Sequence, residues 1–194
     1  MSRYRTICAD PPWPLKPGGP QTIGSFAAAG ARPGTLPYVG MPIAEIKALP
    51  IQDLAAPGAH LYVWTVNQFV EDTYEIARAW GFKPSTLLTW CKTPNGIGLG
   101  GTYSLTTEHI LFCRRGTCAA AERIDSTWWH WKRAGHSAKP EAFLDMVERV
   151  SPAPRLEIFA RRARFGWDYA GDGSLGTVEI PGLRAPGEGG IIAA

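Results

Sequence analysis

Y-R-T-I-C-A-D-P-P-W, residues 4–13, is the most informative stretch of this chain. Residues 4–9 form a short, mostly apolar run of the kind that becomes a buried strand, and Asp10 ends it. Pro11 and Pro12 then forbid both a helix and further sheet pairing. We therefore expect a carboxylate, a rigid turn rich in carbonyl groups and the indole of Trp13 to lie together at the carboxyl end of a strand.

In open α/β sheets, ligands bind at this edge of the sheet. The arrangement suits a flat base that carries an exocyclic amine. Asp10 and the carbonyl group of Pro11 can accept its two N–H bonds, and Trp13 can stack on its ring. A strand followed by two prolines is also often an ordinary turn, so the tetrapeptide alone leaves both interpretations open.

Length and composition set the broad class of the protein. The chain has 194 residues and a net charge of +3, which fits one domain with a real core and permits an anionic partner without requiring one. No stretch is long and apolar enough to span a membrane and no signal segment opens the chain, so we expect a cytoplasmic protein. We expect reduced thiols and no metal site, because no CxxC pair or zinc-ligand spacing occurs among Cys8, Cys91, Cys113 and Cys118.

Apolar patterns along the chain predict alternating strands and helices. The strands are expected at residues 4–9, 59–65, 85–91, 108–114 and 155–160, and the helices at 42–49, 69–80 and 140–150. Such alternation is typical of an α/β fold with a mostly parallel sheet flanked by helices. We expect one domain over residues 1–173 and a flexible C-terminal tail over 174–194.

Two further stretches invite a functional interpretation. Residues 96–101, G-I-G-L-G-G, have the letters of a dinucleotide-binding motif, but no helix follows them, which favours a loop at the substrate entrance. Trp128, Trp129 and Trp131 surround His130. They predict either a platform on which bases stack or a cluster folded back onto the core, and the sequence leaves both open.

Nine short motifs follow one another in a recognisable order: A-D-P-P-W at 9–13, L-P-Y-x-x-M at 36–41, A-H-L-Y-V-W-T at 59–65, W-G-F at 80–82, T-W-C-K at 89–92, E-H-I-L at 108–111, H-S-A-K-P-E at 136–141, R-L-E-I-F-A-R at 155–161 and G-W-D-Y-A-G-D at 166–172. In this the chain resembles the MT-A70 family of N(6)-adenine methyltransferases, which includes the catalytic subunit that methylates adenosine in eukaryotic mRNA. The resemblance implies a Rossmann-like fold, S-adenosylmethionine as cofactor and a permuted motif order, in which the catalytic tetrapeptide precedes the cofactor strand.

The resemblance also implies roles for single residues. Asp10, Pro11, Pro12 and Trp13 match the catalytic tetrapeptide, and the positions expected near the substrate adenine are Tyr38, Lys92 and Glu108. For Lys92 and Glu108, a plain surface ion pair is the alternative. The residues expected at the cofactor are Asp10, Lys139, Glu157, Phe159, Arg161 and Asp172. Two features support this independently: Lys139 precedes a helix N-terminus, which favours an anion, and a buried strand does not carry Glu157 without a reason.

The chain also departs from the family pattern. Residues 162–165 lack the polar pair that several relatives place on the ribose, and Asp172 replaces the more usual asparagine. The compact form resembles bacterial or phage members and favours DNA over RNA as the substrate. Sequence selection is then expected from the loops at 14–38, 93–106 and 117–135 or from a partner, with a homodimer and a partner subunit both open. The alternatives are a non-catalytic subunit that binds nucleic acid and a methyltransferase for another amine.

Overall fold

The computed structural model describes residues 4–15, 40–92, 102–132, 139–171 and 176–183. Within these residues one seven-stranded sheet has the order β5-β3-β4-β2-β1-β6-β7. The strands are β1 (Tyr4–Ala9), β2 (Ala55–Thr65), β3 (Lys83–Cys91), β4 (Thr107–Arg115), β5 (Trp128–Trp129), β6 (Arg155–Ala160) and β7 (Trp167–Gly171). Strand β4 runs antiparallel to β2 and β3, whereas the other neighbouring pairs are parallel. The predicted α/β fold with a mostly parallel sheet is confirmed.

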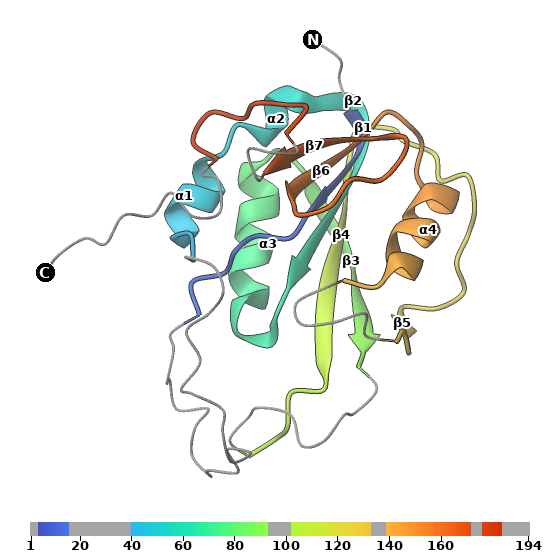
Figure 1. The fold of residues 1–194 in the computed structure, drawn as a ribbon. Coiled ribbons are helices and arrows are strands. Elements are labelled where there is room, and N and C mark those ends of the chain that lie inside the picture. The colour runs from blue at the N-terminus through green and yellow to red at the C-terminus, as the bar shows by residue number, and fades with distance from the viewer. Residues whose placement is uncertain (1–3, 16–39, 93–101, 133–138, 172–175, 184–194) are drawn as a thin grey trace, which may run out of the picture.

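Helices cover both faces of this sheet (Figure 1). They are α1 (Ile43–Ala48), α2 (Ile51–Leu54), the 3-10 turn η2 (Asn67–Phe69), α3 (Val70–Ala79) and α4 (Glu141–Val150). Helices α1 and α3 lie on one face and α4 lies on the other (Figure 1). Helix α4 begins after Pro140, and its buried side chains recur at helical spacing: Phe143, Leu144, Met146 and Val147.

Two hydrophobic clusters therefore form, one on each face of the sheet. Because successive side chains of a strand point to opposite faces, Ile7 of β1 joins the cluster under α1 and α3, and Cys8 joins the cluster under α4. In β2, likewise, Leu61 packs in the first cluster and Tyr62 in the second. Burial on both faces explains why the central strands are nearly continuous apolar runs in the sequence.

Observed and predicted elements agree best in the centre of the sheet. Strands β1 and β6 have the predicted bounds, and the other predicted strands and helices occur with ends shifted by a few residues. Three short elements, α2, β5 and β7, were not predicted, and neither was the antiparallel direction of β4. Periodicity gives little signal over two to five residues, and alternation of strands and helices does not fix the direction of a single strand.

Several strand ends lie together at one edge of the sheet. Strands β1, β2, β3 and β6 end there because they run in the same direction, and antiparallel β4 begins there. Asp10 follows β1, Glu108 lies at the start of β4, and Arg161 follows β6. The topology therefore brings together predicted site residues that are far apart in the sequence.

A bulge shapes the end of β6. Phe159 has a φ of 64°, and the pairing of β6 with β7 changes register between Ile158 and Ala160. A non-glycine residue in this left-handed region is uncommon and costs free energy. Opposite the bulge, a Cβ on Gly171 would come within 2.8 Å of the backbone N and O of Ala160, so only glycine fits.

The predicted boundary at residue 173 stays a prediction. Within the predicted tail, the structure describes residues 176–183, and these lie against the domain. Ile180 is 6% exposed and belongs to the first hydrophobic cluster. The N–H groups of Thr177 and Val178 both donate to the carbonyl oxygen of Tyr169, at 2.9 Å. This segment therefore contacts both β7 and the core.

Candidate active site

Asp10 lies at the centre of a cluster of charged side chains at the carboxyl edge of the sheet. Its Oδ1 is 3.1 Å from the ammonium of Lys139, and its Oδ2 is 3.4 Å from the guanidinium of Arg161. Lys139 lies two residues before the start of α4, and Arg161 directly follows the end of β6. The three predicted residues thus converge from three different elements.

The ammonium of Lys139 also connects Asp10 to Glu108. It lies 3.2 Å from Glu108 Oε2, and the other oxygen of Glu108 forms an ion pair with Lys92. Burial alone would lower the pKa of Lys139, but the carboxylates of Asp10 and Glu108 outweigh it and raise that pKa. Burial likewise opposes ionisation of Glu108, but the two lysines hold its pKa below the usual value. Lys139 and Glu108 therefore both stay charged at neutral pH.

Glu157 is a carboxylate of the site that burial makes harder to ionise. It lies in β6 beside Cys8 of β1, and its Oε2 is buried without a hydrogen-bond partner among the described residues. Burial raises its pKa from 4.5 to about 7; Arg162 pulls the pKa down and nearby Asp10 pushes it up. A ligand could supply the hydrogen-bond donor that Oε2 of Glu157 lacks among the described residues.

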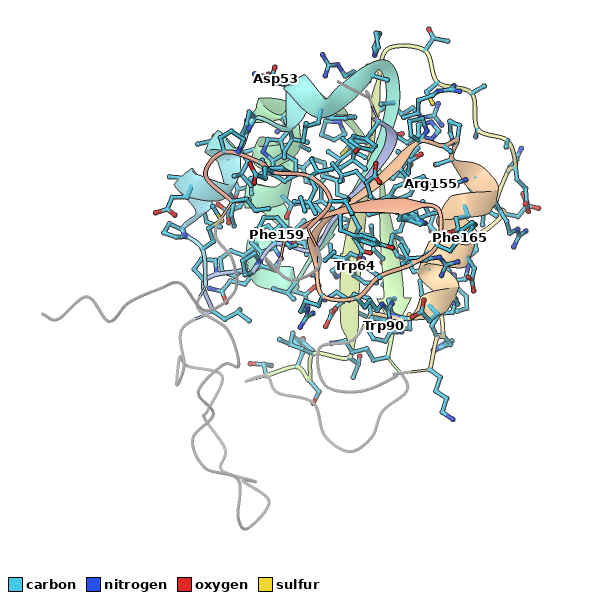
Figure 2. All side chains as sticks on the ribbon, turned by 45° about the horizontal axis from the view of Figure 1, so that its top comes forward. Asp53, Trp64, Trp90, Arg155, Phe159 and Phe165 are labelled. Carbon is cyan, nitrogen blue, oxygen red and sulfur yellow. The ribbon has the colours of Figure 1, made fainter. Side chains whose placement is uncertain are left out.

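A pocket connects these groups. Asp10, Lys139, Glu157 and Arg162 give it polar walls, and Trp64 and Phe143 are among its apolar ones. The indole of Trp64 lies beneath Lys139, whose ammonium is 5.1 Å from the centre of the ring. Figure 2 shows Trp64 between Phe159 and Trp90 in that view. This small pocket therefore combines apolar walls with separate positive and negative groups.

The proline turn after Asp10 is held by its own backbone. The carbonyl group of Pro11 accepts the N–H of Trp13 at 2.9 Å, and that of Pro12 accepts the N–H of Met41 at 2.7 Å. A carbonyl oxygen has two lone pairs, so Pro11 can still accept a second hydrogen bond. The turn is rigid because the returning chain at Met41 holds it in place.

The structure places Trp13 in the core, and its role as a stacking surface for a base stays a prediction. Its side chain is only 3% exposed and stacks on Phe69, with ring centres 5.1 Å apart and an angle of 10°. Its Nε1 donates to the carbonyl group of Trp64 at 3.2 Å. The turn of η2 places Phe69 directly against the indole, and burying two aromatic rings is favourable. Trp13 thus anchors the catalytic turn in the core.

The remaining predicted residues divide into three groups. Lys92 and Glu108 form an ion pair, which Lys139 connects to Asp10, and their predicted place near the substrate adenine stays a prediction. Phe159 packs against the first hydrophobic cluster at the bulge. Tyr38 and Asp172 lie outside the described residues, as do the glycine-rich residues 96–101.

Sequence reasoning missed Arg162 and Arg164. Arg162 donates to the carbonyl oxygen of Lys139 at 3.2 Å and forms an ion pair with Glu141. Arg164 contacts acidic side chains along one side of α4, including Asp145 at 2.6 Å and Glu148 at 2.7 Å. These contacts fasten the β6–β7 loop to the helix that follows Lys139. The cluster of arginines at 161–164 was the available signal.

The tryptophan cluster combines both predicted alternatives. Trp129 and Trp131 stack with ring centres 5.0 Å apart and pack against the second hydrophobic cluster. Trp128, in contrast, is 56% exposed and has His130 against its edge. Two of the three indoles are thus folded back, and one faces solvent.

Comparison with known proteins identifies the class of this fold and site. The MT-A70 family model matches residues 4–173, so the chain belongs to the MT-A70 family of methyltransferases. The chain is 27% identical over 195 residues to the type II methyltransferase M.MunI of Mycoplasma sp, with 92% of this chain and 78% of that protein aligned.

Eukaryotic relatives match over a smaller part of their length. A probable N(6)-adenosine-methyltransferase of Oryza sativa subsp. japonica, described as MT-A70-like, is 27% identical over 97% of this chain and 25% of its own length. The N(6)-adenosine-methyltransferase subunit METTL3 of Danio rerio is 25% identical over 83% of this chain and 26% of its own length. The chain thus spans about a quarter of these two proteins.

No group of His, Cys, Asp or Glu side chains in the described part of the chain could hold a metal ion. No helix in the same residues is long and apolar enough to cross a membrane.

Proposed function

We propose that this protein transfers a methyl group from S-adenosylmethionine to the exocyclic N(6) amine of adenine in DNA. The observation that carries the proposal is the position of Asp10. It ends a central strand on a rigid proline turn, beside the ammonium of Lys139 at 3.1 Å and a pocket that contains an unpartnered carboxylate. Membership of the MT-A70 family supports methyl transfer.

The residues of the pocket fit the cofactor. Its methionine part carries a carboxylate and an ammonium, and the pocket offers a partly buried cation, Lys139, and a carboxylate oxygen of Glu157 that has no hydrogen-bond partner in the described residues. The N-terminus of α4, just after Lys139, adds backbone N–H groups that favour an anion. We further assign Phe159, Arg161 and Asp172 to the ribose and adenine side of the cofactor.

When bound, the cofactor supplies a methyl group activated by the positive sulfonium. The adenine amine is a weak nucleophile because its lone pair is conjugated with the ring. Asp10 and the carbonyl group of Pro11 accept its two N–H bonds and thereby favour the tetrahedral geometry in which the lone pair becomes available. Each carboxylate oxygen accepts more than one hydrogen bond, so Asp10 can bind the amine while it contacts Lys139 and Arg161. Asp10 then accepts the proton that the amine loses.

The substrate assignment rests on the relatives and on three further residues. We favour DNA because the chain covers 78% of the type II methyltransferase M.MunI but only about a quarter of the N(6)-adenosine-methyltransferases. We place Tyr38, Lys92 and Glu108 near the target base, which must leave the stack if the DNA is double-stranded. METTL3 is described as a subunit, which supports a homodimer or a partner chain here as well.

Transfer of label from cofactor to separate pools of DNA, RNA and protein tests the proposal. We expect label on DNA adenine with the native protein and no label with Asp10→Ala. Asp53→Ala is the matched control, because Asp53 is exposed on α2 and lies at the opposite end of the view from Trp90 (Figure 2). Equal labelling by Asp10→Ala would remove Asp10 from the mechanism. Label confined to RNA or protein would overturn the substrate.

A further inference from the structure

A strip of polar and aromatic side chains crosses the carboxyl edge of the sheet on the face that carries α3. We call it the edge strip; it consists of Asn67, His109, Thr89, Trp128 and His130. His109 connects the first three members: its Nε2 is 2.6 Å from Asn67 Oδ1, and its Nδ1 is 3.2 Å from Thr89 Oγ1. Thr89 is the register partner of Trp128, so the two side chains share one face. His130 then contacts the ring of Trp128 edge-on at 5.5 Å.

One end of the edge strip adjoins the catalytic turn. His109 pairs with Thr65, the last residue of β2. Asn67 begins η2, and Phe69 at the end of the same turn stacks on Trp13. The strip therefore runs from the element beneath the Asp-Pro-Pro-Trp turn to β5, the outer strand of the sheet in the described residues.

The other end of the strip presents a flat aromatic face on a fixed backbone. Thr89 donates its N–H to the carbonyl group of Thr127 at 2.8 Å, and the hydroxyl of Ser126 bonds to both the N–H and the carbonyl group of Trp128. Strand alternation turns Trp129 into the core and Trp128 to the other side, where it is 56% exposed. A large exposed indole that its neighbours do not cover is suited to bind a partner.

The polar and aromatic groups of the strip indicate the chemistry of that partner. Its members include two imidazoles and no carboxylate, and the exposed Lys132 follows within two residues of His130. Hydrogen-bonding groups, a nearby cation and an aromatic platform are the combination that binds single-stranded nucleic acid. An exclusively apolar partner would not use the hydrogen-bonding row of Asn67, His109 and Thr89.

We propose that the edge strip binds an unpaired nucleotide on the same strand as the target adenine, with its base stacked on Trp128. Because β5 lies four strand spacings from β1, or about 19 Å at 4.7–4.9 Å each, this nucleotide is not the direct neighbour of the adenine. The inference rests on the proposed function, because it places the flanking strand of that same substrate. It also gives the protein a contact that depends on the base itself and not only on the phosphate backbone.

A cycle of two changes, one in the protein and one in the strand, tests the stacking contact. Fluorescence anisotropy measures the Kd of the full-length protein for a labelled single strand that has one adenine among thymidines. A second strand keeps the adenine and the phosphates but has abasic sites in place of the thymidines. Stacking on one base predicts that the native protein binds the abasic strand about 5- to 150-fold more weakly. Trp128→Ala should lose most of this preference, and Trp128→Tyr should keep much of it.

The controls separate this inference from the proposed function. Phe165→Ala removes another exposed aromatic side chain, between β6 and β7 at the other end of the strand order from β5, and should keep the native preference. Binding is measured without cofactor, so a failure to methylate DNA would contradict the proposed function and leave the cycle informative. An unchanged preference in Trp128→Ala would overturn the edge strip, as would a native protein that binds both strands equally. If Trp128→Ala changed the oligomeric mass of the protein but not its preference between the two strands, the proposal would be overturned and the indole assigned to a contact between copies of the chain.

Discussion

The ammonium of Lys139 lies 3.1 Å from Oδ1 of Asp10, which joins the start of α4 to the tip of β1. The same ammonium contacts Glu108, and the aromatic ring of Trp64 lies beneath it. A largely buried cation held by two carboxylates is costly to remove, because each carboxylate then loses one of its two cationic partners. The position of Lys139 is therefore fixed by the protein before any ligand binds, as expected of a preorganised site.

Lys139→Met should weaken cofactor binding. The substitution keeps an apolar stem and removes the cation that we assign to the cofactor carboxylate. A hydrogen bond to a charged group contributes about 1.5–3 kcal/mol, so the Kd should rise at least tenfold. Isothermal titration with S-adenosylhomocysteine measures it. Lys83→Met, at the opposite end of β3 from the site, is the control; equal affinities of the two variants would remove Lys139 from the cofactor site.

Glu157 should make stability depend on pH. Its pKa in the folded protein is raised from 4.5 to about 7, so between these values the folded state binds its proton more tightly than the unfolded chain. Stability should therefore fall as pH rises through this window, and Glu157→Gln should flatten that part of the curve. Urea unfolding at several pH values measures it, with Glu179→Gln as the exposed control. Parallel curves of stability against pH for native protein and Glu157→Gln would show that folding does not raise the pKa of Glu157.

Trp13 should behave as a core residue. Trp13→Ala removes the stack on Phe69 and the hydrogen bond to Trp64, and large-to-small changes of this kind cost about 3–5 kcal/mol. Trp13→Phe keeps an aromatic ring against Phe69 and should cost much less. Denaturant unfolding of both variants measures the difference. A Trp13→Ala protein of native stability that had lost only nucleic-acid binding would restore the original stacking interpretation.

The bulge at Phe159 should make Gly171 intolerant of a side chain. A Cβ there would lie 2.8 Å from two backbone atoms of Ala160, so Gly171→Ala should destabilise the fold by about 1–3 kcal/mol. Gly176→Ala is the matched control, because nothing lies within 4 Å of a Cβ at that position. Thermal melting compares the two. Equal melting temperatures would mean that β7 can move away from the bulge without cost.

The sequence alone predicted the centre of the fold better than its edges. Strands β1 and β6 are long apolar runs bounded by strong stop signals, and their limits were predicted to the residue. The strand β5 has two residues, and α2 has four, so neither contains one full period of a pattern. The direction of β4, which brings Glu108 to the carboxyl edge, depends on contacts distant in sequence and was not predictable from local pattern.

The site shows the same division. Asp10, Lys139 and Glu157 could be located because a charged residue beside a buried strand or a helix N-terminus is conspicuous in a sequence. The burial of Trp13 was not predicted, because nothing in its neighbourhood shows that Phe69 will stack on it. Arg162 was missed because its target is the backbone of Lys139, and a bond to backbone leaves no side-chain signal.

The central claim is that Asp10 binds and deprotonates the exocyclic amine of adenine at the tip of β1. Mass spectrometry of nucleosides tests it most directly, on DNA treated with cofactor and either native protein or Asp10→Asn, with Asp53→Asn as control. We predict N(6)-methyladenine from native protein and Asp53→Asn, and none from Asp10→Asn. Methylation of a different nucleoside, or undiminished N(6)-methyladenine from Asp10→Asn, would contradict the account.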